Sequence, residues 1–252
     1  MAAAKALEAQ ALAMRDCREC GLCQERTQVV FGVGSPVADL LFVGEGPGFN
    51  EDKQGEPFVG AAGKLLTELL GSIGLTREQV YIANVVKCRP PGNRDPLPDE
   101  IETCSPHLMD QIRVIRPKVV CTLGRFATRL LAQTEASMSS VRGRAKEQEV
   151  AGIPVLLFPV FHPAAALYAP ANKTVLQEDF LKLRRVLALG RDALAGARAG
   201  DVPRPEPADD APAEAAALGA EGGGPGGTVG CAEMEQTCRE APKAPEKQLK
   251  LW

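Results

Sequence analysis

The sequence predicts a three-layer α/β/α fold, in which helices cover both faces of a central, mostly parallel sheet of four strands. Three observations lead to this class. Four short apolar segments have the composition of buried strands, segments with helical periodicity separate them, and polar loops rich in Gly and Pro adjoin them. Ligands bind such sheets beyond the carboxyl ends of the strands. We therefore expect the functional site in the loops that follow the strands.

The expected strands are runs with almost no polar side chain, such as DLLFVG and KVVCTL, which suits burial on both faces. They cover residues 39–44, 80–86, 118–123 and 153–159. The other segments place apolar residues at helical spacing, beginning with Leu7, Ala11 and Met14. Helices are expected over residues 3–16, 61–73, 98–116 (with a kink at Pro106), 124–133 and 175–189, and an irregular segment or hairpin over 140–151.

The composition changes near residue 200. From there to residue 247 the chain is mostly Ala, Gly, Pro, Glu and Asp, and it includes GAEGGGPGGT. Such a segment buries too little apolar surface to offset the entropy lost on ordering it. We expect a folded domain over 1–190, a disordered linker over 191–247 and a short apolar segment over 248–252.

Composition and charge narrow the class of protein. The 252 residues are 45% hydrophobic, which suffices for one domain with a tail. A net charge of -3 excludes a broadly basic surface that coats nucleic acid, so any DNA contact must be local. The chain has no run of about 18 apolar residues, and its first residues lack the apolar core of a signal peptide. We expect a cytoplasmic protein that does not contact membranes.

Eight cysteines in such a protein favour metal or thiol chemistry over disulfides. Cys17 and Cys20 form a CxxC pair, and 15 residues separate Cys88 from Cys104. Four cysteines can hold zinc or an iron–sulfur cluster, and the wide second spacing favours a cluster, whose ligands lie farther apart. The alternative is that Cys88 and Cys104 are small apolar residues of the core.

The remaining four cysteines are less well placed in the sequence to be metal or cluster ligands. Cys23 extends the first pair to CxxCxxC, but the fourth position of that ferredoxin pattern is Thr27, so the pattern is incomplete. Cys121 lies within an expected strand and should be a core residue. Cys231 and Cys238 lie in the expected linker and are assigned no role.

Two polar residues follow the first and last strands. Glu45 lies in GEGPG, a tight turn whose glycines let a ligand approach the backbone. It is either a catalytic carboxylate or part of a surface turn. His162 lies in FHPAAAL, directly after an apolar strand, where it can donate a hydrogen bond to a developing anion or simply fill a polar position.

Asn84 and Phe58 are the other two candidates for ligand contact. Asn84 lies in a strand of otherwise apolar residues, and a buried amide needs partners. Its side chain can read the edge of a base or bond to a neighbouring loop. Phe58 lies in the polar loop GEPFVG, where it can stack on a flat ligand or plug the core.

Together these segments resemble one family, the iron–sulfur uracil-DNA glycosylases, usually called family 4. The resemblance spans residues 14–188 in unbroken order, through CREC, RTQVVFG, GEGPG, GEPFVGAAGKLL, YIANVVKCRPPGNRDPLPDE and FHPAAAL. It implies the α/β/α fold of the uracil-glycosylase superfamily and a monofunctional enzyme that hydrolyses the N-glycosidic bond of uracil in DNA. The products would be free uracil and an abasic site, as in base excision repair of deaminated cytosine.

The resemblance also implies roles for single residues. One 4Fe–4S cluster would be held by Cys17, Cys20, Cys88 and Cys104. Gly44, Glu45 and Gly46 would form the floor of the uracil pocket, and Phe58 would stack on the base. Asn84 would bond the uracil edge and reject cytosine, and His162 would face uracil O2. The catalytic assignments are therefore Glu45, His162 and Asn84.

Two departures from related classes matter. The better-known uracil glycosylases have Asp where this chain has Gly46, so their water-activating carboxylate is missing and Glu45 is the nearest candidate. A class that traps DNA covalently has Gln at this position and a His-bearing basic loop. The loop RPPGNRDP of this chain has no His, so we do not expect covalent trapping.

Uracil-containing DNA, single- or double-stranded, is the expected partner, bound by a monomer. Loop cations near the expected pocket are candidates for phosphate contact. They are Arg89, Arg94, Arg142, Arg144 and Lys146. The segment 164–170, with Leu167 and Tyr168, would fill the gap left by the flipped base.

The chain ends in a short apolar cluster after the expected linker, formed by Gln248, Leu249, Leu251 and Trp252. This ending resembles the peptide with which bacterial repair proteins bind the sliding clamp, so a tether to the clamp is a hypothesis. Two alternatives to the enzyme remain. One is a non-catalytic Fe–S or Zn module that binds nucleic acid, and the other is an inactive scaffold that depends on the terminal peptide.

Overall fold

A computed structural model describes residues 1–197, with side chains described as far as residue 189. Its sheet has six strands in the order β1-β3-β2-β4-β6-β5. The strands are β1 (Val33–Gly34), β2 (Leu40–Gly44), β3 (Tyr81–Asn84), β4 (Val119–Leu123), β5 (Lys146–Val150) and β6 (Ile153–Val160). The four central strands are parallel, and β1 and β5 pair antiparallel at the two edges.

The prediction of four strands is therefore wrong in number, because the sheet has six. The four predicted strands form its parallel centre. The two edge strands lack the apolar runs that reveal a buried strand. β1 has only two residues, and β5 is the largely exposed sequence KEQEV. Of the segment 140–151, expected to be irregular or a hairpin, residues Lys146–Val150 form β5, which pairs antiparallel with β6 beyond the segment.

Eight α-helices are present in residues 1–197. They are α1 (Ala2–Met14), α2 (Phe49–Gln54), α3 (Ala61–Ser72), α4 (Pro98–Ile115), α5 (Arg125–Ala132), α6 (Met138–Val141), α7 (Pro163–Tyr168) and α8 (Ala171–Ala197). The sequence did not indicate α2, because this short helix between Gly48 and Gly55 has no apolar periodicity. Helix α4 continues through Pro106, and α8 begins and ends beyond the expected helix 175–189.

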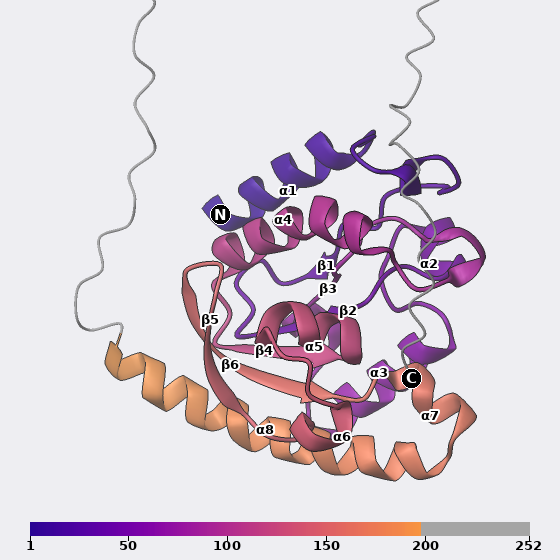
Figure 1. The fold of residues 1–252 in the computed structure, drawn as a ribbon. Helices are drawn as coiled ribbons and strands as arrows, with labels where there is room; N and C mark the ends of the chain where they lie inside the picture. The colour runs from indigo at the N-terminus through magenta and orange to yellow at the C-terminus, as the bar shows by residue number, and fades with distance from the viewer. Residues whose placement is uncertain (198–252) are drawn as a thin grey trace, which may run out of the picture. The chain divides into compact units, whose positions relative to one another are not determined.

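The helices cover both faces of the sheet, which confirms the three-layer class (Figure 1). Side chains of the strands alternate between two cores, so Leu41 and Val43 of β2 face one and Leu40 and Phe42 face the other. Helices α1, α4 and α5 contribute to the first core, and α3, α7 and α8 to the second. The carboxyl ends of β2, β3, β4 and β6 consequently meet at one edge.

None of the helices in residues 1–197 is long and apolar enough to cross a membrane. Cys121 is completely buried in β4, as expected of a core residue. The expected linker beyond Ala197, with Cys231 and Cys238, lies outside the described residues. The terminal cluster of Gln248, Leu249, Leu251 and Trp252 lies outside them as well.

Candidate active site

A pocket of about 390 Å³ opens where the parallel strands end. It brings together five of the six residues expected to contact uracil. Those five are Glu45, Gly46, Phe58, Asn84 and His162. Gly44 lies directly behind them, because a Cβ atom there would overlap Asn84 Oδ1 and lie 2.7 Å from the Phe58 ring. Glycine at this position therefore lets the Asn84 and Phe58 side chains lie against the strand.

Asn84 ends β3 with its side chain facing the pocket and only 1% exposed. Its Oδ1 atom has no hydrogen-bond partner among the residues that the structure describes. A buried acceptor without a partner carries a desolvation cost of about 1–3 kcal/mol, and it is the kind of exception that indicates a functional site. The atom is available to a ligand that brings a hydrogen-bond donor into the pocket.

His162 forms the N-cap of α7, where its Nδ1 accepts the backbone N–H of Ala164 at 3.1 Å. Nδ1 therefore carries no proton, and the proton of the neutral ring is on Nε2. Burial lowers the pKa of His162 to about 4, although the carboxylate of Glu51 acts in the opposite direction. The imidazole is neutral near pH 7 and offers an N–H donor.

Phe58 and His162 pack against each other, with ring centroids 5.5 Å apart and planes inclined by 31°. The backbone of Phe58 has φ +56°, which is uncommon for a bulky side chain. Two polar side chains hold this turn in place. Arg77 donates to the Phe58 carbonyl at 3.1 Å, and Glu51 Oε1 accepts the next N–H groups, of Val59 and Gly60, at 3.0 and 2.9 Å.

Glu45 is partly buried directly after β2. Burial and, to a smaller extent, the nearby Asp95 raise its pKa, Arg125 lowers it, and the resulting pKa is about 7. Asp95 and Arg125 also form an ion pair with each other. Glu45 therefore exchanges a proton near neutral pH, which suits a group that accepts a proton from water.

The four cysteines of the expected cluster surround one region. Burial raises the pKa of Cys104 to about 11, with smaller contributions from Cys20 and Cys17. Burial likewise raises the pKa of Cys88 to about 12, with contributions from Cys104 and Cys20, while Arg26 lowers it. Arg26 donates to Cys88 Sγ at 3.1 Å and to the Cys17 carbonyl at 2.6 Å. The Lys87 N–H donates to Cys104 Sγ at 3.3 Å.

The spacing of these sulfurs fits a cluster better than a single zinc ion. A zinc ion bound to four thiolates at about 2.3 Å holds the sulfurs about 3.8 Å apart. Within residues 1–197 the only three or more metal-ligating side chains with atoms all within 4.8 Å of one another are Cys17, Glu19 and His107. No three of the four cysteines meet that limit, whereas a cluster requires ligands that are farther apart.

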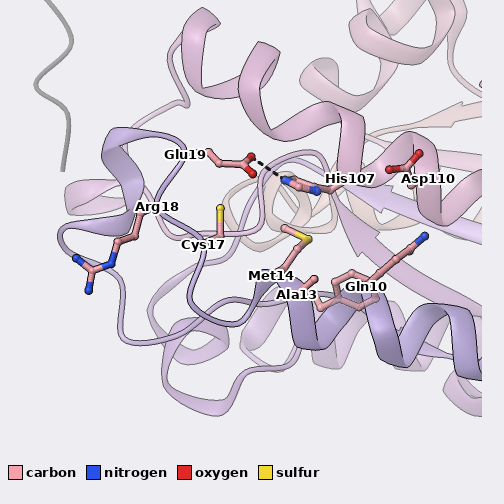
Figure 2. Close-up of a pocket in the computed structure, with 9 residues that line it drawn as sticks. Gln10, Ala13, Met14, Cys17, Arg18, Glu19, His107 and Asp110 are labelled. Atoms are coloured by element: carbon pink, nitrogen blue, oxygen red, sulfur yellow. Dashed lines mark hydrogen bonds and ion pairs between the residues drawn. The ribbon is translucent and has the colours of Figure 1, made fainter. Parts of the chain in front are cut away.

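Cys17, Glu19 and His107 line a second pocket, of about 300 Å³, beside the cysteine loop. Figure 2 shows Glu19 and His107 joined next to the Cys17 side chain, and His107 Nε2 lies 3.1 Å from Glu19 Oε2. This group shares Cys17 with the four-cysteine set. A single ion bound here and a cluster bound by the four cysteines would therefore exclude each other.

The candidate cations for DNA contact differ in whether an acidic side chain pairs with them. Arg94 forms a two-bond ion pair with Glu100, at 2.6 and 2.8 Å, and Arg142 pairs with the buried Asp179. These partners offset the two charges. Arg89, Arg144 and Lys146 form no ion pair with an acidic side chain of the described residues. Tyr168 lines the pocket while 89% exposed, and Leu167 beside it is 47% exposed.

Sequence reasoning missed several residues of the site. Glu51 and Asn93 line the pocket, Asp95 and Arg125 influence Glu45, and Lys87 is completely buried beneath Asn84. Glu51 belongs to the short helix that the sequence did not indicate. A charged residue inside the apolar end of a strand, as in VVKC, is a signal that could have identified Lys87.

Comparison with known proteins identifies the class. The sequence model of the "Uracil DNA glycosylase superfamily" matches residues 31–184, which is more than half of the chain. "Type-4 uracil-DNA glycosylase" of Sulfurisphaera tokodaii is 51% identical over 175 residues, 68% of this chain and 80% of that protein. The protein of the same name from Archaeoglobus fulgidus is 50% identical over 66% of this chain and 86% of its own length. That from Thermotoga maritima is 44% identical over 68% of this chain and 89% of its own length. The chain belongs to the type-4 uracil-DNA glycosylases.

Proposed function

We propose that this protein removes uracil from DNA by hydrolysing the N-glycosidic bond, which yields free uracil and an abasic site. The observation with the most weight is the unpaired Asn84 Oδ1 in the same pocket as the neutral imidazole of His162. A pocket that presents a buried acceptor, a neutral N–H donor and an aromatic ring suits a flat, neutral heterocycle. The non-catalytic metal module is not favoured, because it needs none of these groups.

Asn84 supplies selectivity in this proposal. Uracil presents a donor at N3 and an acceptor at O4, which match the Oδ1 acceptor and the amide donor of Asn84. Cytosine presents an acceptor at N3 and a donor at its 4-amino group, so both contacts would be repulsive. Of these two bases, uracil gives the unpaired Oδ1 its missing partner, and a site with buried polar groups strongly rejects ligands that leave them unpaired.

His162 and Glu45 supply the chemistry. When the C1′–N1 bond breaks, its electron pair stays with uracil, and the negative charge spreads onto O2. The Nε2–H of His162 donates to O2, and one such donor in a buried site contributes about 3–4 kcal/mol in other enzymes. Water adds to C1′ from the other side, and its proton goes to Glu45 or to solvent. Gly44 and Gly46 form the floor, and Phe58 stacks on the base.

The enzyme must rotate the uracil nucleotide out of the DNA, so it needs residues that fill the vacated space and residues that hold the phosphates. Extrusion costs a few kcal/mol, and less in a mismatch or a single strand, so both strand types are proposed substrates. Leu167 and Tyr168, exposed at the pocket rim, would fill the vacated space. Arg89 and Arg144 are the phosphate contacts we favour, because Arg94 and Arg142 are paired with carboxylates.

We propose that Cys17, Cys20, Cys88 and Cys104 hold one 4Fe–4S cluster. When bound, the cluster would join the N-terminal loop to the segment after β3 without taking part in bond cleavage. Its test is anaerobic purification followed by iron and sulfide analysis and a visible spectrum. Four irons with absorption near roughly 400 nm would support the cluster. One zinc per chain in an active protein would remove this assignment and leave the glycosylase intact.

The deciding experiment measures uracil release from an oligonucleotide that contains one uracil. Matched strands with cytosine or thymine at the same position serve as controls. We expect release from the uracil strand alone, and a loss of roughly 10²–10³-fold in kcat for His162→Ala. A Glu8→Gln variant, changed at an exposed residue of α1, should keep full activity. Absence of release by intact, cluster-loaded protein would remove the proposal.

Three further assignments are proposals as well. Residues 248–252 would tether the enzyme to a bacterial sliding clamp, and a pull-down in which their deletion leaves clamp binding unchanged would exclude the tether. The enzyme would act in the cytoplasm as a monomer.

A further inference from the structure

Phe49 is an exposed aromatic residue that two cations contact. It opens α2 and is 48% exposed. The Lys53 ammonium lies 4.3 Å from the centre of its ring, and the Arg89 guanidinium lies 5.1 Å from it. The two cations come from distant segments, one from α2 and the other from the loop after β3. A single phenyl ring therefore contacts two positive charges that come from separate segments of the chain.

Neither cation is neutralised. Within residues 1–197, Lys53 and Arg89 form no ion pair with an acidic side chain. The Arg89 side chain instead donates from Nε to Asn93 Oδ1 at 2.7 Å, which fixes its orientation and leaves its charge unpaired. Two cations beside one ring, with no acidic side chain of the described residues paired to either, create a positive potential that favours an anion nearby.

The pair lies at the rim of the pocket that would hold uracil. Gly48 precedes Phe49 in the chain, and Pro90 follows Arg89, and both of these neighbours line the pocket. Asn93, which accepts the Arg89 hydrogen bond, lines it too. A nucleotide whose base enters the pocket has its own phosphates at this rim, because the backbone cannot follow the base inside.

We propose that Phe49, Lys53 and Arg89 form a phosphate-binding site for the DNA strand that carries the uracil, at a linkage next to the extruded nucleotide. Phe49 is the positioning residue, because its ring orients both cations through cation–π contacts before DNA arrives. Lys53 and Arg89 are the binding residues. This inference rests on the proposed function and identifies residues through which the strand is held.

The test uses the salt dependence of binding to a uracil-free single strand, which does not require activity. Each lost phosphate contact lowers the slope of log K against log salt by about 0.7 for single strands. Because the two cations share one phosphate, the variant K53Q/R89Q should lose about 0.7 from the slope. Lys5→Gln removes an exposed charge from α1 and should leave the slope unchanged.

A second measurement locates the phosphate. Replacing the charged linkage on either side of the uracil by a neutral methylphosphonate should lower kcat/KM of the wild-type protein about tenfold at one of the two positions. K53Q/R89Q should show no further loss at that position. Phe49→Leu keeps both charges, and in this background Lys53→Gln should have a smaller effect than in the wild-type protein.

An unchanged slope in K53Q/R89Q overturns the proposal. So does a lower kcat with an unchanged slope, because that result means Arg89 only supports the pocket through Asn93. Failure of the proposed function is distinguishable, since it would appear as no uracil release by the wild-type protein while the change in binding slope persists.

Discussion

The Lys87 ammonium donates a hydrogen bond of 2.9 Å to the backbone carbonyl of Asn84, the residue that would read the base. Lys87 is completely buried, and it also bonds the side chain of Gln111 at 2.5 Å. Its own backbone N–H donates to Cys104 Sγ. Lys87 thus contacts both Asn84 in the pocket and Cys104, a proposed cluster ligand. Burial lowers the pKa of Lys87 to about 8.

Lys87→Met should therefore lower the activity of the enzyme more than it lowers the stability of the fold. The substitution removes a buried charge, and it leaves the Asn84 carbonyl and Gln111 Oε1 without this donor, at about 1–3 kcal/mol for each. Because removal of the buried charge offsets part of this cost, we expect a net loss of about 1–3 kcal/mol in the free energy of unfolding, measured in urea, and a lower kcat/KM for uracil DNA. Lys64→Met, at an exposed position of α3, is the matched control. Full activity in Lys87→Met would show that this hydrogen bond does not position Asn84.

Asn84→Leu should separate stability from function. The Asn84 side chain is 1% exposed with an unpaired Oδ1, so an apolar side chain of similar size relieves a desolvation cost. We expect the free energy of unfolding to rise by about 1 kcal/mol, while uracil release falls by roughly 10²-fold or more. Thermal melts and release assays on one preparation would check both. A variant that is both less stable and fully active would contradict the assignment of Asn84 as the base reader.

The pH dependence of kcat should report on Glu45. Because its pKa is raised to about 7, the carboxylate that accepts a proton forms as pH rises, so kcat should increase through about pH 7. Arg125→Gln removes a charge that lowers this pKa and should move the midpoint to higher pH. Asp95→Asn removes a charge that raises it and should move the midpoint to lower pH. Shifts in the same direction for the two variants would exclude Glu45 as the titrating group, and Glu45→Gln should abolish the transition.

His162 should make the protein sensitive to acid. Its pKa is lowered to about 4 in the folded state, so between about pH 6.5 and 4 the unfolded state binds a proton that the folded state does not. Stability is therefore lost as pH falls through this window, by up to about 3 kcal/mol. His162→Asn keeps an acceptor for the helix N-cap and should remove this loss. Urea unfolding at pH 7 and pH 4.5 tests this, and equal losses in both proteins would locate the acid sensitivity elsewhere.

The sequence was sufficient for the parallel centre of the fold and for five residues that line the pocket, but not for Glu51 or Asn93, which line it too. Apolar runs such as those of β2 and β4 form strands wherever both faces are covered, so periodicity identifies them. The charged edge strand β5 and the one-turn helix α2 depend on their neighbours and carry no such pattern. The motifs predicted Asn84 and His162, but not that Nδ1 of His162 accepts a backbone hydrogen bond or that Arg94 is paired with Glu100. Those facts depend on contacts between segments far apart in the chain.

The two edge strands of the sheet are short or charged, unlike the apolar strands of its centre, and this affects how the sheet can pair with other molecules. β1 offers only two residues for pairing, and β5 exposes Lys146, Glu147 and Glu149. A strand from another molecule would find too few backbone groups at one edge and would have to bring its side chains against charges at the other. Pairing of this sheet with the edge of a sheet from another molecule is therefore disfavoured at both β1 and β5.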